Sequence, residues 1–311
     1  MRVLVTGGAG FIGSHVVERL LAAGLEVAVL DNFSSGRRAN VPDGVRILQA
    51  DLRDREATQR LVRGFDPELV SHHAAQASVP LSMKDPRVDA EVNVIGGINL
   101  LDACGGPSSR TRHLVFASTA TYGEVPDDQR ADESAPLEPK SPYAISKLGF
   151  ERLLGVYREQ RGLTTTVLRY ANVYGPRQAP HGESGVVAIF FDAALAARKL
   201  TIFARRQVGD GGCVRDYVYV DDVVRANLHA LTDKVERDVL NVGSGVATTS
   251  QQLAERVLSL TGSHSPVEHG PVRPGDLERS VLDPTRFERA VGAPTSLDVG
   301  LRETARWYGA S

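Results

Sequence analysis

Residues 6–13 have the sequence Thr6-Gly7-Gly8-Ala9-Gly10-Phe11-Ile12-Gly13. They follow the apolar run Val3–Val5 and open a helical pattern over Gly10–Ala23. Glycines at this spacing allow a tight strand-to-helix turn and let a pyrophosphate approach the backbone at the helix N-terminus. The stretch predicts a dinucleotide-binding βαβ unit, with cofactor contacts from Gly7, Gly10, Phe11, Ile12 and Gly13.

An acidic residue closes the next predicted strand. Asp31 stands eighteen residues after Gly13, where a carboxylate accepts hydrogen bonds from the adenosine ribose and repels a 2′-phosphate. The sequence therefore favours NAD over NADP. The pair Asp51-Leu52 follows the third predicted strand and is expected at the adenine edge, with an N-cap of the next helix as the equal alternative for Asp51.

The first half of the chain alternates β-branched runs with longer helical patterns, which is typical of parallel βαβ units. We predict strands at Val3–Val5, Val27–Leu30, Val45–Gln49, Leu69–His72, His113–Ala117 and Thr165–Tyr170. The helices of this half are predicted at Gly10–Ala23, Arg55–Arg63, Val88–Ala103 and Pro142–Arg161. Beyond the Pro- and Gly-rich loop Pro176–Gly185, helices are predicted at Val186–Ala197, Asp221–Leu231, Gln251–Thr261 and Asp298–Trp307, and strands at Thr201–Phe203, Tyr217–Val220 and Val239–Val242.

This order of elements predicts an α/β fold, a Rossmann-type doubly wound parallel sheet with a smaller, interleaved C-terminal α/β substrate lobe. Residues 1–174 are expected to form the NAD-binding domain, to which residues 217–243 return. Residues 175–216 and 244–311 are expected to form the substrate lobe.

Composition excludes several other classes of protein. The 311 residues carry a net charge of −2, and the arginines form no basic block, so no nucleic-acid partner is expected. The apolar runs are too short for a membrane span, and Val3–Val5 leaves no room for a leader peptide. The two cysteines give neither a disulfide framework nor a metal site. We expect a cytoplasmic protein without a metal.

Tyr143 and Lys147 form the second informative motif. Ser141-Pro142 predicts an N-cap followed by proline at the first helical position, which places Tyr143 in the first turn and Lys147 one turn later on the same face. A tyrosine pKa near 10 must fall by about three units for a base at neutral pH, about 4 kcal/mol. An ammonium about 4 Å away supplies roughly that amount at an effective dielectric constant near 20. The pair predicts proton transfer, and Ser118, at the end of a predicted strand, is the candidate to hold the reacting oxygen.

With these motifs the chain resembles the extended short-chain dehydrogenase/reductases, and among them the bacterial UDP-glucose (UDP-galactose) 4-epimerases. The resemblance runs almost end to end. It includes Thr6–His15, Asp31-Asn32, Asp51-Leu52, Asn93, Ser118–Gly123, Tyr143-x-x-x-Lys147, Arg169-Tyr170-Ala171-Asn172, Val214-Arg215-Asp216-Tyr217 and Arg273-Pro274-Gly275-Asp276-Leu277.

The resemblance implies bound NAD, a UDP-sugar substrate and a homodimer. It gives Ser118, Tyr143 and Lys147 the catalytic roles, and it adds Asn32 and Asn93 to the cofactor site. It also implies that Asn172 contacts the sugar and diphosphate, that Arg215 and Arg273 clamp the diphosphate, that Asp276 holds the ribose, and that Phe203 packs against uracil. The resemblance further implies that Ser280 lines the sugar pocket near C2, where a small side chain would leave room for an N-acetyl group.

The sequence departs from the family pattern at two places. Ala77 stands where many of these enzymes have a lysine near the pyrophosphate, and Val186-Val187 replaces an Asn-Leu pair near the nucleotide.

Related enzymes remain as alternatives. The 4,6-dehydratases place an Asp-Glu pair directly after the catalytic hydroxyl, whereas Ser118 is followed by Thr119-Ala120-Thr121. UDP-glucuronate decarboxylases usually have an acid in that stretch, and UDP-glucuronate 4-epimerases usually have a threonine at the position of Asn172. A non-catalytic NAD-sensing Rossmann protein tends to lose the Tyr-x-x-x-Lys motif, which is intact here.

The expected homodimer pairs the helices Val88–Ala103 and Pro142–Arg161 of two chains. Their predicted outer apolar residues are Ile98, Leu101, Phe150 and Leu154, with burial inside one chain as the alternative.

Overall fold

A computed structural model describes residues 1–105, 109–180, 185–232, 239–273 and 275–310. The chain divides into two compact units, which its course interleaves. Unit 1 comprises Met1–Thr119, Ser141–Arg169 and Val224–Leu240, and unit 2 comprises Ala120–Lys140, Tyr170–Val223 and Asn241–Ser311. Four segments predicted to belong to the NAD-binding domain cluster with unit 2, namely residues 120–140, 170–174, 217–223 and 241–243.

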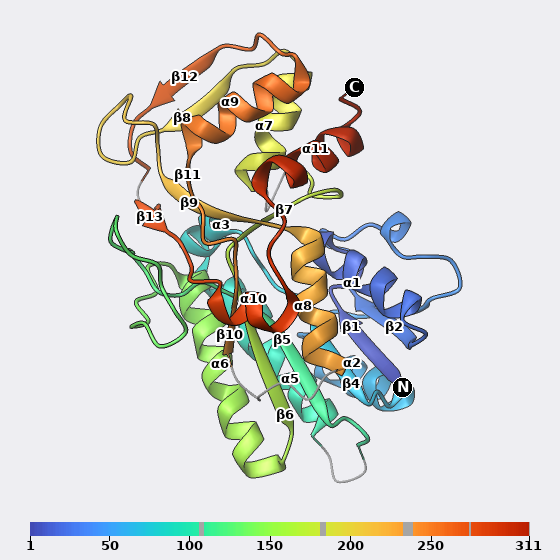
Figure 1. Cartoon of the computed structure of the whole chain (residues 1–311). Coiled ribbons are helices and arrows are strands. Elements are labelled where there is room, and N and C mark those ends of the chain that lie inside the picture. Colours follow the sequence, from blue (N-terminus) through green and yellow to red (C-terminus); the bar gives the residue numbers. More distant parts are fainter. Residues whose placement is uncertain (106–108, 181–184, 233–238, 274, 311) are drawn as a thin grey trace. The chain divides into compact units, whose positions relative to one another are not determined.

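Unit 1 is built on a seven-stranded sheet with the order β10-β6-β5-β4-β1-β2-β3 (Figure 1). Its strands are β1 (Arg2–Thr6), β2 (Glu26–Asp31), β3 (Arg46–Gln49), β4 (Leu69–His72), β5 (His113–Thr119), β6 (Thr164–Tyr170) and β10 (Val239–Val242). Its helices are α1 (Phe11–Ala22), η1 (Arg38–Asn40), α2 (Arg55–Phe65), α3 (Val79–Lys84), α4 (Pro86–Ala90), η2 (Glu91–Ile95), α5 (Gly96–Cys104), α6 (Pro142–Arg161) and most of α8 (Val220–Thr232). The sheet confirms the predicted Rossmann-type α/β class.

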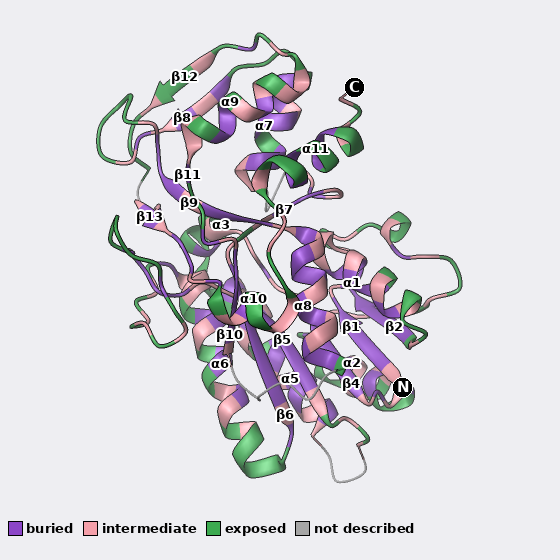
Figure 2. Ribbon diagram, in the orientation of Figure 1, coloured by how far each residue is buried: buried purple, intermediate pink, exposed green. Residues whose placement is uncertain are grey.

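Helices cover both faces of this sheet. Alternate strand residues such as Leu4 and Phe116 join a core cluster that includes residues of α2, α5 and α6. Val29 points to the other face, because a side chain on Gly8 would meet both Val29 and Val17 of α1. Strands buried on both faces carry near-continuous apolar runs, and Figure 2 shows the central strands almost wholly buried.

Unit 2 has two small sheets. Strand β9 (Val214–Tyr219) is central to the larger sheet and pairs with three strands, β7 (Asn172–Tyr174), β11 (Ala247–Thr249) and β13 (Arg279–Ser280). The smaller sheet pairs β8 (Leu200–Phe203) with β12 (Val267–Gly270). The helices are α7 (Val186–Leu195), α9 (Ser250–Thr261), α10 (Thr285–Val291) and α11 (Leu297–Tyr308). A second core cluster joins α7, α9 and α11 to these strands.

The predicted elements agree with the structure in most places. The predicted helix Val88–Ala103 is a continuous helical stretch in which Glu91–Ile95 forms a π-helical turn, η2. The short elements α3, β7, β11, β12, β13 and α10 were not predicted, because fragments of this length carry too few residues for a periodic pattern. Residues 181–184 of the predicted loop and Pro274 of the quoted motif lie outside the described residues.

The predicted outer face of the two dimer helices is wrong. Leu101, Phe150 and Leu154 are fully buried in the core of unit 1, and Ile98 is half-buried. The helices turn Leu101, Phe150 and Leu154 toward the core of unit 1, so burial inside one chain accounts for these three residues. No helix among the described residues has the length and apolarity to cross a membrane.

Candidate active site

The glycine loop between β1 and α1 leaves no space for side chains at Gly7, Gly8 and Gly13. Gly7 has φ +68°, and a Cβ there would lie 2.6 Å from the amide nitrogen of Ala74. A Cβ on Gly13 would lie 2.2 Å from the carbonyl oxygen of Gly7. Gly10 differs, since its nearest neighbour would be that same carbonyl oxygen at 3.2 Å. Gly7 and Gly13 thus make the turn, and Gly10 leaves the approach to the helix open.

The N-terminus of α1 fits a diphosphate. Gly10 is the N-cap and supplies no capping side chain, and the first turn contains no acidic residue. The first amides of a helix have no intrahelical acceptor, and the helix dipole is positive at this end. The amides of Phe11, Ile12 and Gly13 can therefore donate to an anion, which is what the pyrophosphate of NAD requires.

Asp31 holds the glycine loop. Its carboxylate is 7% exposed and accepts hydrogen bonds from the amides of Ala9, at 3.0 Å, and Phe33, at 2.8 Å. Each bond uses a different carboxylate oxygen, so each oxygen retains a lone pair for a ribose hydroxyl. Asp31 thus fits the predicted ribose contact and also orders the loop.

Asp51 is held by two neighbours. Arg53 binds its carboxylate with two nitrogens, at 2.8 and 3.0 Å, and the amide of Asn32 donates at 2.9 Å. The Arg53 guanidinium keeps the pKa of Asp51 well below its usual range. The alternative role of Asp51 as a helix cap is wrong, because Asp54 caps α2.

Leu52 follows Asp51 and belongs to the apolar core of unit 1. Its side chain is 6% exposed, and its carbonyl accepts the amide of Asn99 at 2.8 Å. Its backbone is thus anchored to α5.

Asn93, in the π-helical turn, is a connector. Its amide oxygen accepts from the nitrogen of Gln76 at 2.9 Å, and its amide nitrogen donates to the carbonyl of Gln76, to Asp89 and to the hydroxyl of Ser146. Ser146 immediately precedes Lys147, so Asn93 ties the loop after β4 to the helix that carries the Tyr–Lys pair. Both the oxygen and the nitrogen of the Asn93 side-chain amide thus have partners within the protein.

Helix α6 begins as predicted. Ser141 has extended backbone angles and accepts the amide of Ala144, and Pro142 occupies the first turn. Tyr143 is half-buried in the same turn, and Lys147 is 3% exposed one turn later. The structure therefore has both residues on one helical face, with the ammonium out of bulk water.

Two adjacent histidines, His72 and His73, lie near Lys147, and the sequence reasoning missed both. Burial, and then the charge of Lys147, lower the pKa of His72 far below 6.5 and that of His73 to about 3. His72 contacts the hydroxyl of Thr6 at 2.7 Å, and the Lys147 ammonium lies 4.4 Å from the ring centre of Phe116. Their place at the carboxyl end of a predicted strand was the signal that could have identified them.

Ser118 points into the core. Its hydroxyl donates to Glu151 at 2.5 Å, and Glu151 forms an ion pair with Arg169 at 2.8 Å, with both charged side chains 5% exposed. This bond argues against the predicted contact between Ser118 and a reacting oxygen. Thr119, the next residue, ends β5 and is half-buried. Side chains alternate along a strand, so the Thr119 hydroxyl faces away from that buried ion pair.

In unit 2 the predicted substrate residues gather on and around β9. The strand register pairs Arg215 with Ser280 of β13 on one side and with Thr248 of β11 on the other. Asn172 is exposed at the start of β7 and pairs with Tyr217. Paired residues share a face of the sheet, so Arg215 and Ser280 lie side by side.

Arg273 contacts both Phe203 and Asp276. The guanidinium of Arg273 lies 4.4 Å from the ring centre of Phe203 and binds the carboxylate of Asp276 at 2.7 and 2.8 Å. The three residues with predicted roles toward diphosphate, ribose and uracil thus form one group.

Asp216 of β9 is a buried carboxylate that binds several backbone amides, and the sequence reasoning gave it no role. Burial raises its pKa, while hydrogen bonds from the amides of Ser244, Gly245 and Leu282 lower it. The carboxylate thus joins the loop after β10 to the residues after β13.

Comparisons with known proteins agree with this geometry. A family model described as the NAD dependent epimerase/dehydratase family matches residues 3–243. A UDP-glucose 4-epimerase of Mycolicibacterium smegmatis is 42% identical, covering 99% of this chain and 98% of the relative. The crystal structure of the Thermus thermophilus UDP-glucose 4-epimerase in complex with NAD is 52% identical over 100% of both chains, with a TM-score of 0.96. That of the Thermotoga maritima UDP-glucose 4-epimerase with UDP-glucose is 43% identical over 99% of both, with a TM-score of 0.93.

Proposed function

Because the chain belongs to the NAD-dependent epimerase/dehydratase family, we propose that it inverts C4 of a UDP-hexose and interconverts UDP-glucose and UDP-galactose. The observation that carries the proposal is the pairing of Tyr143 with a buried Lys147 in the first two turns of α6. The strand before it, β5, is followed by Ala120-Thr121, which lack the acids that a dehydratase needs.

The chemistry follows from the position of this pair. NAD, when bound at the glycine loop, supplies the acceptor and donor of the hydride. Tyr143 as phenolate accepts the proton of the C4 hydroxyl, the 4-keto sugar then turns about its diphosphate so that hydride can return to the opposite face of C4, and Tyr143 gives the proton back to the C4 oxygen. Lys147 stabilises the phenolate by its charge, and its burial beside neutral His72 and His73 keeps that charge unscreened.

The hydroxyl that holds the reacting oxygen is assigned to Thr119 instead of Ser118. Ser118 already donates to Glu151 and is 3% exposed, whereas Thr119 lies at the carboxyl end of the strand, where ligands of open α/β sheets bind.

The nucleotide part of the substrate belongs to unit 2. Arg215 and Arg273 bind the diphosphate, because a guanidinium fork matches phosphate oxygens, and Asn172 contacts the sugar. Asp276 accepts from the ribose, and Phe203 packs against uracil. The contacts of Arg273 with both Phe203 and Asp276 support these assignments, because one nucleotide can reach all three residues.

Assembly is also part of the proposal. The exposed apolar side chains of unit 1 include Leu81 and Met83 of α3, Ile95 of η2 and Ile145 of α6, and both α3 and η2 contact α6. We expect a homodimer to cover this face. The interface would then use these exposed side chains and not the buried Leu101, Phe150 and Leu154. Both cysteines are free thiols, which agrees with a cytoplasmic enzyme.

The test is turnover without an external oxidant or reductant. Purified protein loaded with NAD is incubated with UDP-galactose, and the products are separated by chromatography. We expect UDP-glucose at equilibrium with no accumulation of NADH. A product that has lost water or carbon dioxide would replace this proposal with a dehydratase or a decarboxylase.

A further inference from the structure

Strand β13, which carries Ser280, is only two residues long and pairs with β9 through Arg279 and Ser280. A pairing of this length cannot hold its own register. A slip of one residue would turn Arg279 onto the face of Arg215 and Ser280 away from it, because side chains alternate along a strand. The register that puts Ser280 beside Arg215 therefore needs support from outside the strand.

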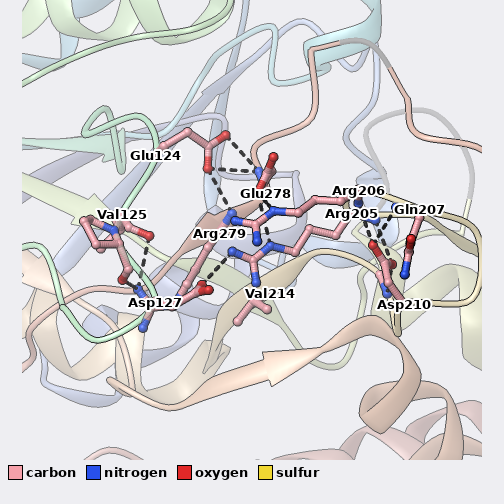
Figure 3. Close-up of polar contacts among 12 residues, drawn as sticks. Glu124, Val125, Asp127, Arg205, Arg206, Gln207, Asp210, Val214, Glu278 and Arg279 are labelled. Carbon is pink, nitrogen blue, oxygen red and sulfur yellow. Dashed lines mark hydrogen bonds and ion pairs between the residues drawn. The ribbon is translucent and has the colours of Figure 1, made fainter.

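The support comes from the loop after Gly123, as Figure 3 shows. The carboxylate of Glu124 accepts the amide of Glu278, at 2.8 and 3.0 Å, and the amide of Arg279, at 3.1 Å. The carbonyl of Arg279 accepts the amide of Val125 at 3.2 Å. Glu124 thus binds two successive backbone amides just before Ser280.

The side chain of Arg279 supplies the second hold. It is 5% exposed, on the face opposite Ser280, and its guanidinium donates to the carbonyls of Val125, Pro126 and Gln129. Burial lowers the pKa of Arg279, and the carbonyl oxygens compensate for the lost water. A guanidinium inserted among three carbonyls of one turn fits a single register.

An outer set of ion pairs surrounds this contact. Arg206 donates to the carboxylate of Glu278 at 2.6 Å, and Arg205 donates to Asp127 at 2.6 Å (Figure 3). The carboxylate of Asp210 accepts the backbone amides of Arg205, Arg206 and Gln207. The carboxylates of Asp127 and Glu278 are exposed, so these pairs contribute little by themselves.

We propose that Glu124 and Arg279 form a register clamp that holds Ser280 beside Arg215 and so determines the shape of the sugar pocket. This inference rests on the proposed function and names positioning residues for it. Glu124 and Arg279 act on the backbone of β13 and touch no substrate.

The test compares Glu124→Ala with Glu138→Ala, a matched exposed glutamate of the same segment that pairs with Lys140. We expect Glu124→Ala to raise KM for UDP-glucose about tenfold, the effect of losing a charge-assisted hydrogen bond, while kcat changes less. It should also change the ratio of kcat/KM between UDP-N-acetylglucosamine and UDP-glucose. Glu124→Gln, which retains one acceptor oxygen, should recover part of both. Glu138→Ala should match the wild type.

A purely structural role would lower the folded fraction and leave KM and the ratio unchanged, which overturns the clamp. Arg279→Lys provides a second test. Lysine keeps a buried charged donor, but it lacks the guanidinium that fits among the three carbonyls. An unchanged ratio of kcat/KM in this variant therefore counts against the clamp as well. Calorimetric binding of UDP separates the two proposals. A wild type that neither binds UDP nor epimerises refutes the function, whereas an active wild type with an unaffected Glu124→Ala refutes only the clamp.

Discussion

Lys147 of unit 1 is 3% exposed, whereas the side chain of Arg273 in unit 2 is 52% exposed. The Lys147 ammonium lies over the ring of Phe116, and its charge acts on the buried surroundings of His72 and His73. The residues proposed to bind the nucleotide are linked through Arg273, which contacts both Phe203 and Asp276. Under the proposed function, the catalytic charge is thus fixed in advance where burial strengthens charge effects, whereas the substrate is bound by an exposed charge that would exchange a protein partner for the ligand.

Removing the hydroxyl of Tyr143 should have the largest effect on turnover. Tyr143→Phe deletes the proton acceptor but retains the ring, so we expect kcat to fall by about 10²–10⁴. NAD content of the purified protein, read from its absorbance after release, should be unchanged. An active Tyr143→Phe enzyme would remove the proposed mechanism.

The second largest effect should distinguish the hydroxyl of Thr119 from that of Ser118. Thr119→Ala is expected to lower kcat by about a hundredfold, the scale of losing a hydrogen bond made in the transition state. Ser118→Ala leaves Glu151 paired with Arg169, so it should cost stability and little kcat. Single-turnover rates at saturating substrate check this, and the reverse order of the two variants would restore Ser118 as the contact.

In unit 2, Arg273→Ala should raise the dissociation constant of UDP by roughly tenfold to a hundredfold. The variant also leaves the Phe203 ring and Asp276 without their partner. Titration calorimetry gives the affinity, with Arg256→Ala, an exposed arginine paired with Asp298, as the control. Equal affinities in Arg273→Ala and wild type would show that Arg273 does not bind the diphosphate.

The sugar pocket should respond more selectively. Ser280→Tyr fills the space proposed for an N-acetyl group, so kcat/KM for UDP-N-acetylglucosamine should fall roughly tenfold or more, with UDP-glucose little affected. If both substrates suffer equally, or the wild type rejects the acetamido sugar, the gate lies elsewhere.

The last expected effect concerns the pH dependence of stability, and it is absent above about pH 6.5. Between pH 3 and 6.5 the unfolded chain binds a proton at residue 73 that the folded chain, with its His73 pKa of about 3, does not bind. Stability is therefore complete above about pH 6.5 and falls with decreasing pH by at most about 1.4 kcal/mol per unit for this residue. Urea unfolding at several pH values should show a shallower slope for His73→Gln. The same slope in both proteins would contradict the neutral, buried state.

Much of unit 1 was predictable because its signals are local. Gly7 is required by its positive φ and Gly13 by the carbonyl oxygen of Gly7, and Ser141-Pro142 opens α6 by capping, so the sequence pattern and the structure agree. Unit 2 was less predictable. Its strands β7, β11 and β13 have two or three residues each, and their pairing with β9 comes from segments far apart in the chain.

The roles of Ser118 and of the helix faces show the same limit. Nothing near Ser118 in the sequence indicates that Glu151, thirty-three residues later, accepts its hydroxyl. Phe150 and Leu154 form an apolar stripe in either case, and a stripe indicates burial without indicating the partner.

The sequence by itself determined the α/β class, the glycine loop, the acid at Asp31 and the Tyr143–Lys147 pair. Each depends on a turn, a cap or a repeat within a few residues. Only the tertiary structure decided which hydroxyl of β5 is buried, which apolar side chains remain exposed, and how Glu124 and Arg279 hold Ser280 beside Arg215. Those outcomes depend on contacts between segments far apart in the chain. Such contacts contribute to the free energy of folding only when the packed chain excludes water from them.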